Sequence, residues 1–322
     1  MGKILAYIQC ANGDPTRNAL EAFRAAQLLA ADLEYQLSGT VFGAHLPDSV
    51  KALKMDQLIH VQSPSLMSYT PELFVAAMDA VMKTESPDIM IAGHTYQVRD
   101  WLPRLAGQRN CPMVSDCIGY HIDPELIWVR QVFQGKINAD VVTSAEQVIV
   151  SFQSGAYRAD QLENGNPSIR AMEVDLSQVT LHVRPGEKFQ DTKDSIDLSH
   201  AERIISVGRG ISEEAKLSII HELAAVLDAE LASSRPVVDY GWLEHDRQVG
   251  SSGQTVSPKL YLAVGLSGAI QHQVGMKNSG CIVAINKDAN APIFEIADYG
   301  VVADLFEIIP QLTTALAERQ KA

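Results

Sequence analysis

The chain has 322 residues, of which 46% are hydrophobic and 20% charged, a length and composition typical of about two globular domains. Asp and Glu outnumber Lys and Arg by 39 to 26, which gives a formal net charge of −13. Such a surface repels nucleic-acid phosphates, so nucleic-acid binding is excluded unless a local basic patch overrides it. No apolar run approaches the roughly 20 residues that a membrane-spanning helix needs, so membrane insertion is not expected.

The amino-terminal segment and the cysteines favour a cytoplasmic protein. The segment MGKILAYIQC leads directly into a strand-like run and has no small-residue cleavage site of the secretory kind. Cys10, Cys111, Cys117 and Cys281 lie mostly in apolar runs without C-x-x-C spacing, which favours buried, reduced thiols. The nine histidines also lack metal-ligand spacing. We therefore expect a cytoplasmic chain without a metal site.

The first half of the chain alternates strand-like and helix-like segments. The predicted strands are residues 3–10, 39–44, 57–61 and 88–92, and the predicted helices are residues 16–34, 49–55, 71–82 and 98–108. This alternation is typical of a mainly parallel sheet with flanking helices. Between residues 126 and 152 the segments IWVRQVFQG and EQVIVSFQSG alternate apolar and polar residues and end at glycines. That pattern predicts an added antiparallel section.

The second half repeats the α/β pattern after a polar stretch. Residues 186–200 have no apolar face, which predicts a linker between domains 1–185 and 201–322. The predicted elements beyond it are strands at 203–207, 261–264 and 281–285, a helix at 212–230 capped by Ser212, and a helix at 304–316 that is interrupted or restarted at Pro310. The fold expected is therefore α/β, with two domains that are each built on a mainly parallel sheet with flanking helices.

Clusters of small and polar residues follow the strands of the second domain. They are VGRG at 207–210, ASSRP at 232–236, VGLSGAIQH at 264–272 and INKD at 285–288. Because the carboxyl ends of parallel strands share one edge of a sheet, these clusters are expected to meet there. Backbone N–H groups and helix starts at such an edge bind polar or anionic ligands, and a nucleotide-type cofactor suits it.

Several functions compete for these residues. Residues 208–213 match only part of the dinucleotide fingerprint, and a tight turn explains them as well. Ser267 resembles part of a nucleophile elbow, but His272 follows it in the wrong chain order for a hydrolase triad. A Ser-Gly pair that opens a helix and supplies N–H groups to a ligand uses the same residues. Arg209 and Arg235 are compatible with a solvated role or a ligand-facing one. A non-redox nucleotide-binding regulatory or assembly module is the alternative function.

The stretch from Ser233 to Pro310 resembles the alpha subunit of the electron-transferring flavoprotein, through SRP, QVG, SPKLY, GLSGAIQH, AINKD, APIF and ADYGVVADLF. VGRG extends the resemblance toward the amino terminus, and FQGKINADV and SGAYRAD are similar to the family's antiparallel section. The resemblance implies a heterodimer in which this chain holds FAD in its second domain and a beta subunit carries AMP or a second FAD. It implies an electron shuttle without substrate chemistry of its own.

The resemblance also implies partners and site residues. The expected electron donors are dehydrogenases, such as those acting on acyl-CoA in fatty acid β-oxidation, and the expected acceptor is a quinone oxidoreductase or another protein. The residues implied to surround FAD are Arg209, Ser234, Arg235, Gln248, Val249, Gly250, Ser251, Ser252, Gly265, Ser267, Gly268, Ala269, Gln271, His272, Asn286, Asp304 and Leu305.

Particular roles come with these positions. Arg235 and His272 are implied to stabilise negative charge on the N1 and C2 carbonyl side of the reduced flavin. Ser252 is implied to place a hydroxyl donor toward ring N5. Ser267 and the backbone that opens its helix are implied to bind the pyrophosphate. Asn286 and Asp304 are implied to hold the adenosine end.

One loop departs from the family pattern. The family commonly has QVGQTGK, whereas this chain has Gln248-Val-Gly-Ser-Ser-Gly-Gln254. Ser252 keeps a hydroxyl but lacks the threonine methyl group that restricts the rotamer. Ser251 is too short to span what a glutamine would. FAD binding is expected to persist, with altered tuning of the flavin.

Overall fold

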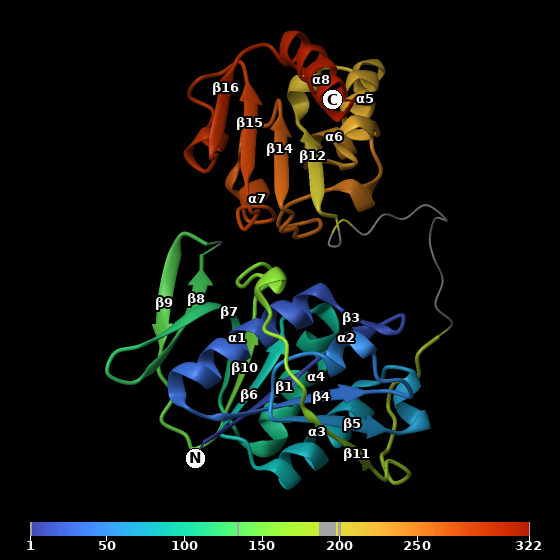
Figure 1. Ribbon diagram of the computed structural model, residues 1–322, viewed down its shortest axis with the longest axis vertical. Coiled ribbons are helices and arrows are strands. Elements are labelled where there is room, and N and C mark those ends of the chain that lie inside the picture. Colours follow the sequence, from blue (N-terminus) through green and yellow to red (C-terminus); the bar gives the residue numbers. More distant parts are fainter. Residues whose placement is uncertain (1, 134, 187–197, 199–200, 322) are drawn as a thin grey trace. The chain divides into compact units, whose positions relative to one another are not determined.

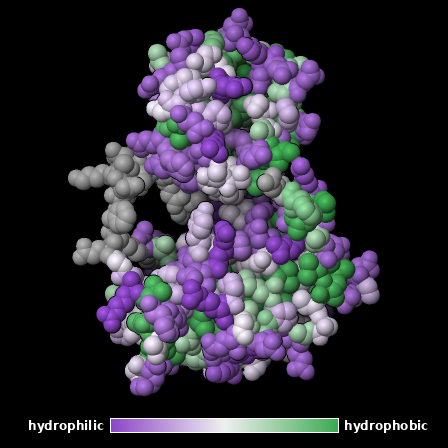
Figure 2. Space-filling view, turned by 180° about the vertical axis from the view of Figure 1, so that it is seen from behind, coloured by the Kyte–Doolittle hydropathy of each residue, from purple (hydrophilic) through white to green (hydrophobic). Residues whose placement is uncertain are grey.

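The computed structural model describes residues 2–133, 135–186, 198 and 201–321. The chain divides into two compact units, Met1–Lys188 and Phe189–Ala322, and each has its own sheet (Figure 1). Most of the linker expected at residues 186–200 lies outside the described residues. None of the helices in the described ranges has both the length and the apolar character that crossing a membrane requires. On the face seen in Figure 2, hydrophilic residues dominate the surface of each unit.

Nine strands form the main sheet of the first unit. They are β1 (Lys3–Tyr7), β4 (Gln36–Phe42), β5 (Gln57–Gln62), β6 (Ile89–Gly93), β7 (Met113–Ile122), β8 (Leu126–Val132), β9 (Ile137–Val141), β10 (Val148–Phe152) and β11 (Ser168–Glu173). Their order is β11-β5-β4-β1-β6-β10-β7-β8-β9. Neighbours are parallel from β11 through β7, whereas β8 is antiparallel to β7 and β9. A short antiparallel ladder pairs β2 (Cys10–Ala11) with β3 (Asp14–Pro15).

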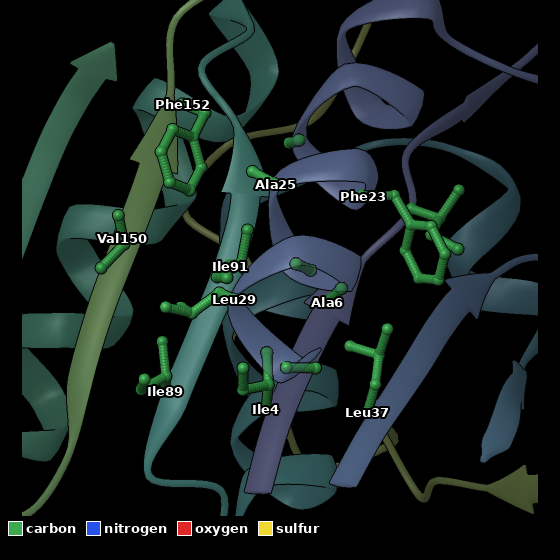
Figure 3. Close-up of a cluster of buried hydrophobic side chains, with 14 of the residues drawn as sticks. Ile4, Ala6, Phe23, Ala25, Leu29, Leu37, Ile89, Ile91, Val150 and Phe152 are labelled. Atoms are coloured by element: carbon green, nitrogen blue, oxygen red, sulfur yellow. The ribbon is translucent and has the colours of Figure 1, made fainter. Parts of the chain in front are cut away.

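Helices cover both faces of this sheet. They are α1 (Arg17–Leu33), α2 (Asp48–Lys51), α3 (Pro71–Glu85) and α4 (Tyr96–Arg109). Helix α1 lies across the strands on one face, where its Ala25 and Leu29, four residues apart on one side of the helix, share a buried cluster with Ile4 and Ile91 (Figure 3). Fully buried Trp101 belongs to the cluster that joins α3 and α4 to the other face. The strands between these layers are buried on both sides.

The prediction of an antiparallel section between residues 126 and 152 is confirmed for β8 and wrong for β10. Residues 148–152 form a parallel strand between β6 and β7, and all five are buried. Parallel strands that are buried on both faces carry near-continuous apolar runs, and VIVSF is such a run. The antiparallel section consists instead of β7, β8 and β9. Neither β7 nor the edge strand β11 was predicted, since neither shows a continuous apolar run.

The second unit is a five-stranded, wholly parallel sheet. Its strands are β12 (Arg203–Val207), β13 (Glu230–Ser233), β14 (Leu260–Val264), β15 (Ile282–Asn286) and β16 (Tyr299–Val302), in the order β13-β12-β14-β15-β16. Its helices are α5 (Ser218–Leu227), α6 (Arg235–Asp239), α7 (Ile270–Gln273) and α8 (Leu305–Lys321). Helices α5 and α8 pack together on one face. Loop residues such as Val256 and Met276 cover the other.

Two helix predictions in this unit are wrong in detail. Ser212 does not cap a helix: its φ is +68°, outside the extended region of N-cap residues, and its hydroxyl donates to the Gly210 carbonyl at 3.2 Å. The α-helix begins only at Ser218, after two 3₁₀ turns, and residues 230–233 form a strand. Helix α8 continues through Pro310, which is exposed, because buried Leu305 and Ile309 anchor its first turns to the sheet.

Candidate functional site

The strand order of the second unit places a topological switch point between β12 and β14. The chain leaves β12 to form β13 on one side and then crosses to β14 on the other. Open parallel sheets bind ligands outside the carboxyl ends of their strands at such points. The turns found there are VGRG after β12 and GLSG after β14, which confirms that the strand-end clusters share one edge.

Glycine allows the two turns at the switch point to make backbone contact. Gly208 N donates to Val264 O at 2.9 Å, and Gly210 N donates to Gly265 O at 3.1 Å. A Cβ on Gly208 would lie 2.3 Å from the Gly265 oxygen. Gly265 has a φ of +61°, which favours glycine. Glycine at these positions therefore lets the two turns pack backbone against backbone at this edge of the sheet.

The end of β15 is tied to the same edge by Asn286. Its side-chain amide donates to the Leu266 carbonyl at 2.7 Å. Gly268, with a φ of +79°, turns the chain against Ile293, and Ile293 N donates to Ser267 O at 3.1 Å. The Ser267 side chain is exposed at this turn. The Ser-Gly pair precedes the short helix α7, which begins at Ile270 and contains His272.

The loop that departs from the family pattern folds back on itself and contacts α7. Gln254 N donates to Gln248 O at 2.7 Å, and Ser251 N donates to Gln271 O at 2.7 Å. The Gln248 side-chain amide donates to Ser252 Oγ at 2.9 Å. Since this bond uses an acceptor position of the hydroxyl, the Ser252 hydrogen can point elsewhere. The hydrogen bond from Gln248 thus restricts the rotamer of Ser252, as the methyl group does for the threonine that the family has at this position.

The remaining loop residues differ in exposure. Val249 is buried in the cluster on the loop-covered face, and Gly250 has a φ of +140° against the Gln271 backbone. Ala269 and Gln271 are exposed. Ala269 O accepts from His272 N at 2.8 Å. Backbone contacts with Gln271 thus join the loop of residues 248–254 to α7.

The cationic residues of the edge face solvent. Ser234 N donates to Val207 O at 3.0 Å, which joins the turn after β13 to the VGRG turn. The Arg235 side chain is 70% exposed, and its Nε lies 3.4 Å from Asp239 Oδ2. Arg209 is also exposed. Both guanidinium groups are accessible to an anionic ligand, which would compete with Asp239 for Arg235.

The start of α8 borders the glycine turn. Asp304 Oδ1 accepts from Phe306 N at 2.9 Å, so one carboxylate oxygen is engaged at the helix start. A Cβ on Gly265 would lie 3.0 Å from Leu305 Cδ2, and Leu305 is buried. A ligand hydroxyl that bonds to Asp304 would therefore use the other carboxylate oxygen.

His272 is buried, with 7% of its surface exposed. Its Nε2 lies 2.8 Å from the Tyr261 hydroxyl, and its Nδ1 has no hydrogen-bond partner among the described residues. Burial lowers the pKa of His272 to about 4, while the Val249 backbone acts in the opposite direction. The imidazole is therefore neutral near pH 7, with one N–H donor and one acceptor nitrogen and no positive charge. A buried, unpaired nitrogen needs a ligand or a water molecule as its partner.

Tyr261 was not predicted to take part in the site. It lies in the apolar strand run LYLAV and is fully buried. The signal was present, because a tyrosine hydroxyl that is buried in a strand must find a polar partner. Which partner it finds depends on how α7 folds against β14, and local sequence does not reveal that.

Comparison with known proteins identifies two matching family models. The "Electron transfer flavoprotein domain" matches residues 4–177, and the "Electron transfer flavoprotein FAD-binding domain" matches residues 197–277. The chain is 32% identical to the electron transfer flavoprotein subunit alpha of Bacillus subtilis, over 97% of this chain and 96% of the relative. It is 35% identical to the corresponding subunit of Thermoanaerobacterium thermosaccharolyticum, over 96% of each. It is 31% identical to lactate dehydrogenase (NAD(+),ferredoxin) subunit LctC of Acetobacterium woodii, over 97% of this chain and 76% of the relative.

Proposed function

Because the chain belongs to the family of electron transfer flavoprotein alpha subunits, we propose that it carries electrons between partner proteins and holds FAD at the carboxyl ends of β12 to β15. One observation carries this proposal: the loops within residues 197–277, the segment that matches the family's FAD-binding domain, converge on one sheet edge. Bound FAD supplies the reversible uptake of electrons. The chain supplies binding and electrostatics.

The residues at this edge fit such a group in three respects. The turns at Gly208 and Gly265 meet at the carboxyl ends of β12 and β14, the kind of sheet edge at which a pyrophosphate binds. Arg209 and Arg235 place exposed cations there, in a chain whose net charge is −13. The buried His272 Nδ1 has no hydrogen-bond partner among the described residues. A ligand with phosphates and ring acceptors would satisfy all three.

We assign the roles of the ring-side residues by their chemistry. Arg235 supplies positive charge and His272 a neutral N–H donor, and both stabilise negative charge on the N1 and C2 carbonyl side of the reduced ring. Ser252, whose oxygen accepts from Gln248, donates its hydroxyl hydrogen toward N5. These three side chains favour the reduced form.

The other residues of the edge hold the dinucleotide. Ser267 and the backbone N–H groups around Gly268 bind the pyrophosphate. Asn286 and Asp304 bind the adenosine end. The Asn286 amide donates one hydrogen to Leu266 O, so its second N–H hydrogen is the one available to the ligand.

The proposed partners follow from the family. The chain pairs with an electron transfer flavoprotein beta subunit, which carries AMP or a second FAD. Its electrons come from dehydrogenases, such as those acting on acyl-CoA, and pass to a quinone oxidoreductase or another acceptor. A link to dehydrogenases is supported by the Acetobacterium woodii relative, which is named as a subunit of a lactate dehydrogenase.

The test is a visible absorption spectrum of the chain purified with its beta subunit, before and after stepwise reduction, with the cofactor released by heat and identified. We expect a flavin spectrum that bleaches reversibly, and FAD in the released fraction. Arg235→Gln should weaken FAD binding about tenfold or more, since a hydrogen bond to a charged group contributes roughly 1.5–3 kcal/mol.

Arg158→Gln is the matched control, because Arg158 is also an exposed arginine paired with an aspartate, at 2.7 Å from Asp160, but lies in the first unit. It should leave FAD binding unchanged. A folded, colourless complex that cannot be reconstituted with FAD would overturn the proposal. Adenine nucleotide released without flavin would identify a non-redox nucleotide-binding module.

A further inference from the structure

A buried polar pair stands behind the ligand edge of the second unit. Tyr261, on β14, is fully buried, and His272 is 7% exposed. The phenol oxygen and His272 Nε2 are 2.8 Å apart, and the rings are tilted by 59°. The contact joins the strand to the turn after it, because His272 lies in α7. The partner of Nε2 is therefore a side chain and not the ligand.

The protonation states of the pair limit how the hydrogen bond can run. Burial raises the pKa of Tyr261 well above its usual value, so the phenol keeps its hydrogen near pH 7. Burial lowers the pKa of His272 to about 4, so the imidazole is neutral and has a single N–H. Either the phenol donates to Nε2 and the hydrogen of the ring is on Nδ1, or Nε2–H donates to the phenol oxygen and Nδ1 is bare.

The surroundings of the pair favour the first arrangement. Ser206, on the neighbouring strand β12, lowers the pKa of Tyr261 against the larger effect of burial, but the contact with Nε2 is the only hydrogen bond of standard geometry that the phenol makes with the described residues. In the second arrangement the phenol hydrogen would therefore be buried without an acceptor. The Val249 backbone favours the protonated form of His272 against the larger effect of burial, but no hydrogen bond of standard geometry joins it to Nδ1. In the first arrangement the Nδ1–H is therefore left for a ligand.

We propose that Tyr261 is a positioning residue, which donates its phenol hydrogen to Nε2 and so holds His272 as the Nδ1–H tautomer, with that N–H available as a donor to the ring of FAD. This inference rests on the proposed function. It explains why a tyrosine occupies an otherwise apolar strand and why a buried imidazole has an unpaired nitrogen. Without the phenol, the ring can carry its hydrogen on either nitrogen.

The test reads the tautomer directly. The chain is labelled with ¹⁵N-histidine, purified with its beta subunit, and studied by long-range ¹H–¹⁵N correlation near pH 7.5, with the signals of His272 identified by their loss in His272→Gln. In the wild type we expect a protonated Nδ1 and a bare Nε2. In Tyr261→Phe we expect the two nitrogen shifts to move toward each other or to exchange. The affinity for FAD should fall roughly threefold to tenfold, the effect of one hydrogen bond.

Tyr240→Phe is the matched control. Tyr240 lies in the same unit but is 58% exposed and stacks on Trp242, so its loss of a hydroxyl should change neither the imidazole shifts nor FAD affinity. A wild-type His272 with its hydrogen on Nε2 would overturn the inference without any variant. Unchanged imidazole shifts in a folded Tyr261→Phe protein would overturn it too. A complex without FAD would instead contradict the proposed function, and the imidazole shifts would still decide the tautomer.

Discussion

The polar side chains at the carboxyl-end edges of the two sheets differ in their hydrogen bonding. In the first unit the polar groups bond to one another: Thr95 Oγ1 donates to Gln9 Oε1 at 2.5 Å, and His94 Nδ1 lies 2.8 Å from Ser151 Oγ. In the second unit the edge is lined by glycine backbone, and buried His272 has an unpaired Nδ1 among the described residues. Both edges follow parallel strands.

Both units are α/β sheets, so the fold alone does not make a sheet edge a ligand site. The two edges differ in which polar groups lack a hydrogen-bond partner within the protein. In the first unit, Thr95 and His94 have hydrogen-bond partners in Gln9 and Ser151. The Asn18 amide, packed against Gly93, is an exception, since neither of its polar atoms has a partner among the described residues. In the second unit Gly208 and Gly265 let the two turns pack together, and His272 Nδ1 is left without a partner among the described residues.

The largest expected effect comes from adding one carbon atom to the glycine edge. Gly208→Ala would place Cβ 2.3 Å from the Gly265 carbonyl oxygen, which is backbone and cannot move aside cheaply. We expect the second unit to lose about 2–4 kcal/mol of stability and FAD binding to be lost. Differential scanning calorimetry, with FAD content measured on the same sample, checks both.

Gly107→Ala is its control in the first unit. Gly107 lies in α4, and a Cβ there would meet no atom within 4 Å. Alanine in a helix interior is favoured over glycine by roughly 0.5–1 kcal/mol, so the first unit should become slightly more stable. Equal melting temperatures for the Gly208→Ala and wild-type proteins would contradict the close contact between the two turns.

The next effect is a pH dependence of stability that His272 creates. Its pKa is about 4 in the folded protein, against an ordinary value of 6.5, so the unfolded chain binds the proton more readily. Above pH 6.5 the imidazole is neutral in both states, so its burial costs no protonation energy. As the pH falls from 6.5 toward 4, the free energy of unfolding decreases by up to about 3 kcal/mol. Denaturant titrations of the wild type and of His272→Gln at several pH values should show this difference, with the variant less dependent on pH.

His94→Gln is the comparison in the first unit. Burial also lowers the pKa of His94, but the Asp116 carboxylate raises it and offsets part of the shift. We therefore expect His94→Gln to remove less of the acid-side pH dependence than His272→Gln. The opposite ranking would show that burying His94 in the first unit costs more stability at acid pH than burying His272 in the second.

The smallest effect separates two neighbouring serines. Ser252→Ala removes the hydroxyl that Gln248 positions and should lower the reduction potential of bound FAD by roughly 40 mV, equivalent to about 1 kcal/mol for one electron. Ser251→Ala should leave the potential unchanged, because Ser251 is anchored through its backbone N–H to Gln271. Spectroelectrochemical titration distinguishes them. Equal shifts of the reduction potential in both variants would contradict the role assigned to the Ser252 hydroxyl.

The sequence by itself determined the features that depend on near neighbours. Apolar runs located β12, β14 and β15 to within one residue at each end, because a buried parallel strand must be apolar on both faces. The polar clusters after those strands, and their common edge, followed from strand direction. The family resemblance in the last third of the chain identified the flavoprotein correctly.

Only the tertiary structure decided the details that join distant residues. The expected cap at Ser212 failed because the turn before α5 gives that residue a φ of +68°, and β10 joined the parallel strands because its pairing with β6 and β7 buries both faces. The contact of Gly208 with Gly265 and the pairing of Tyr261 with His272 depend on strand order and register. These contacts form only when separate segments pack, and periodicity within one segment carries no information about which other segment it will meet.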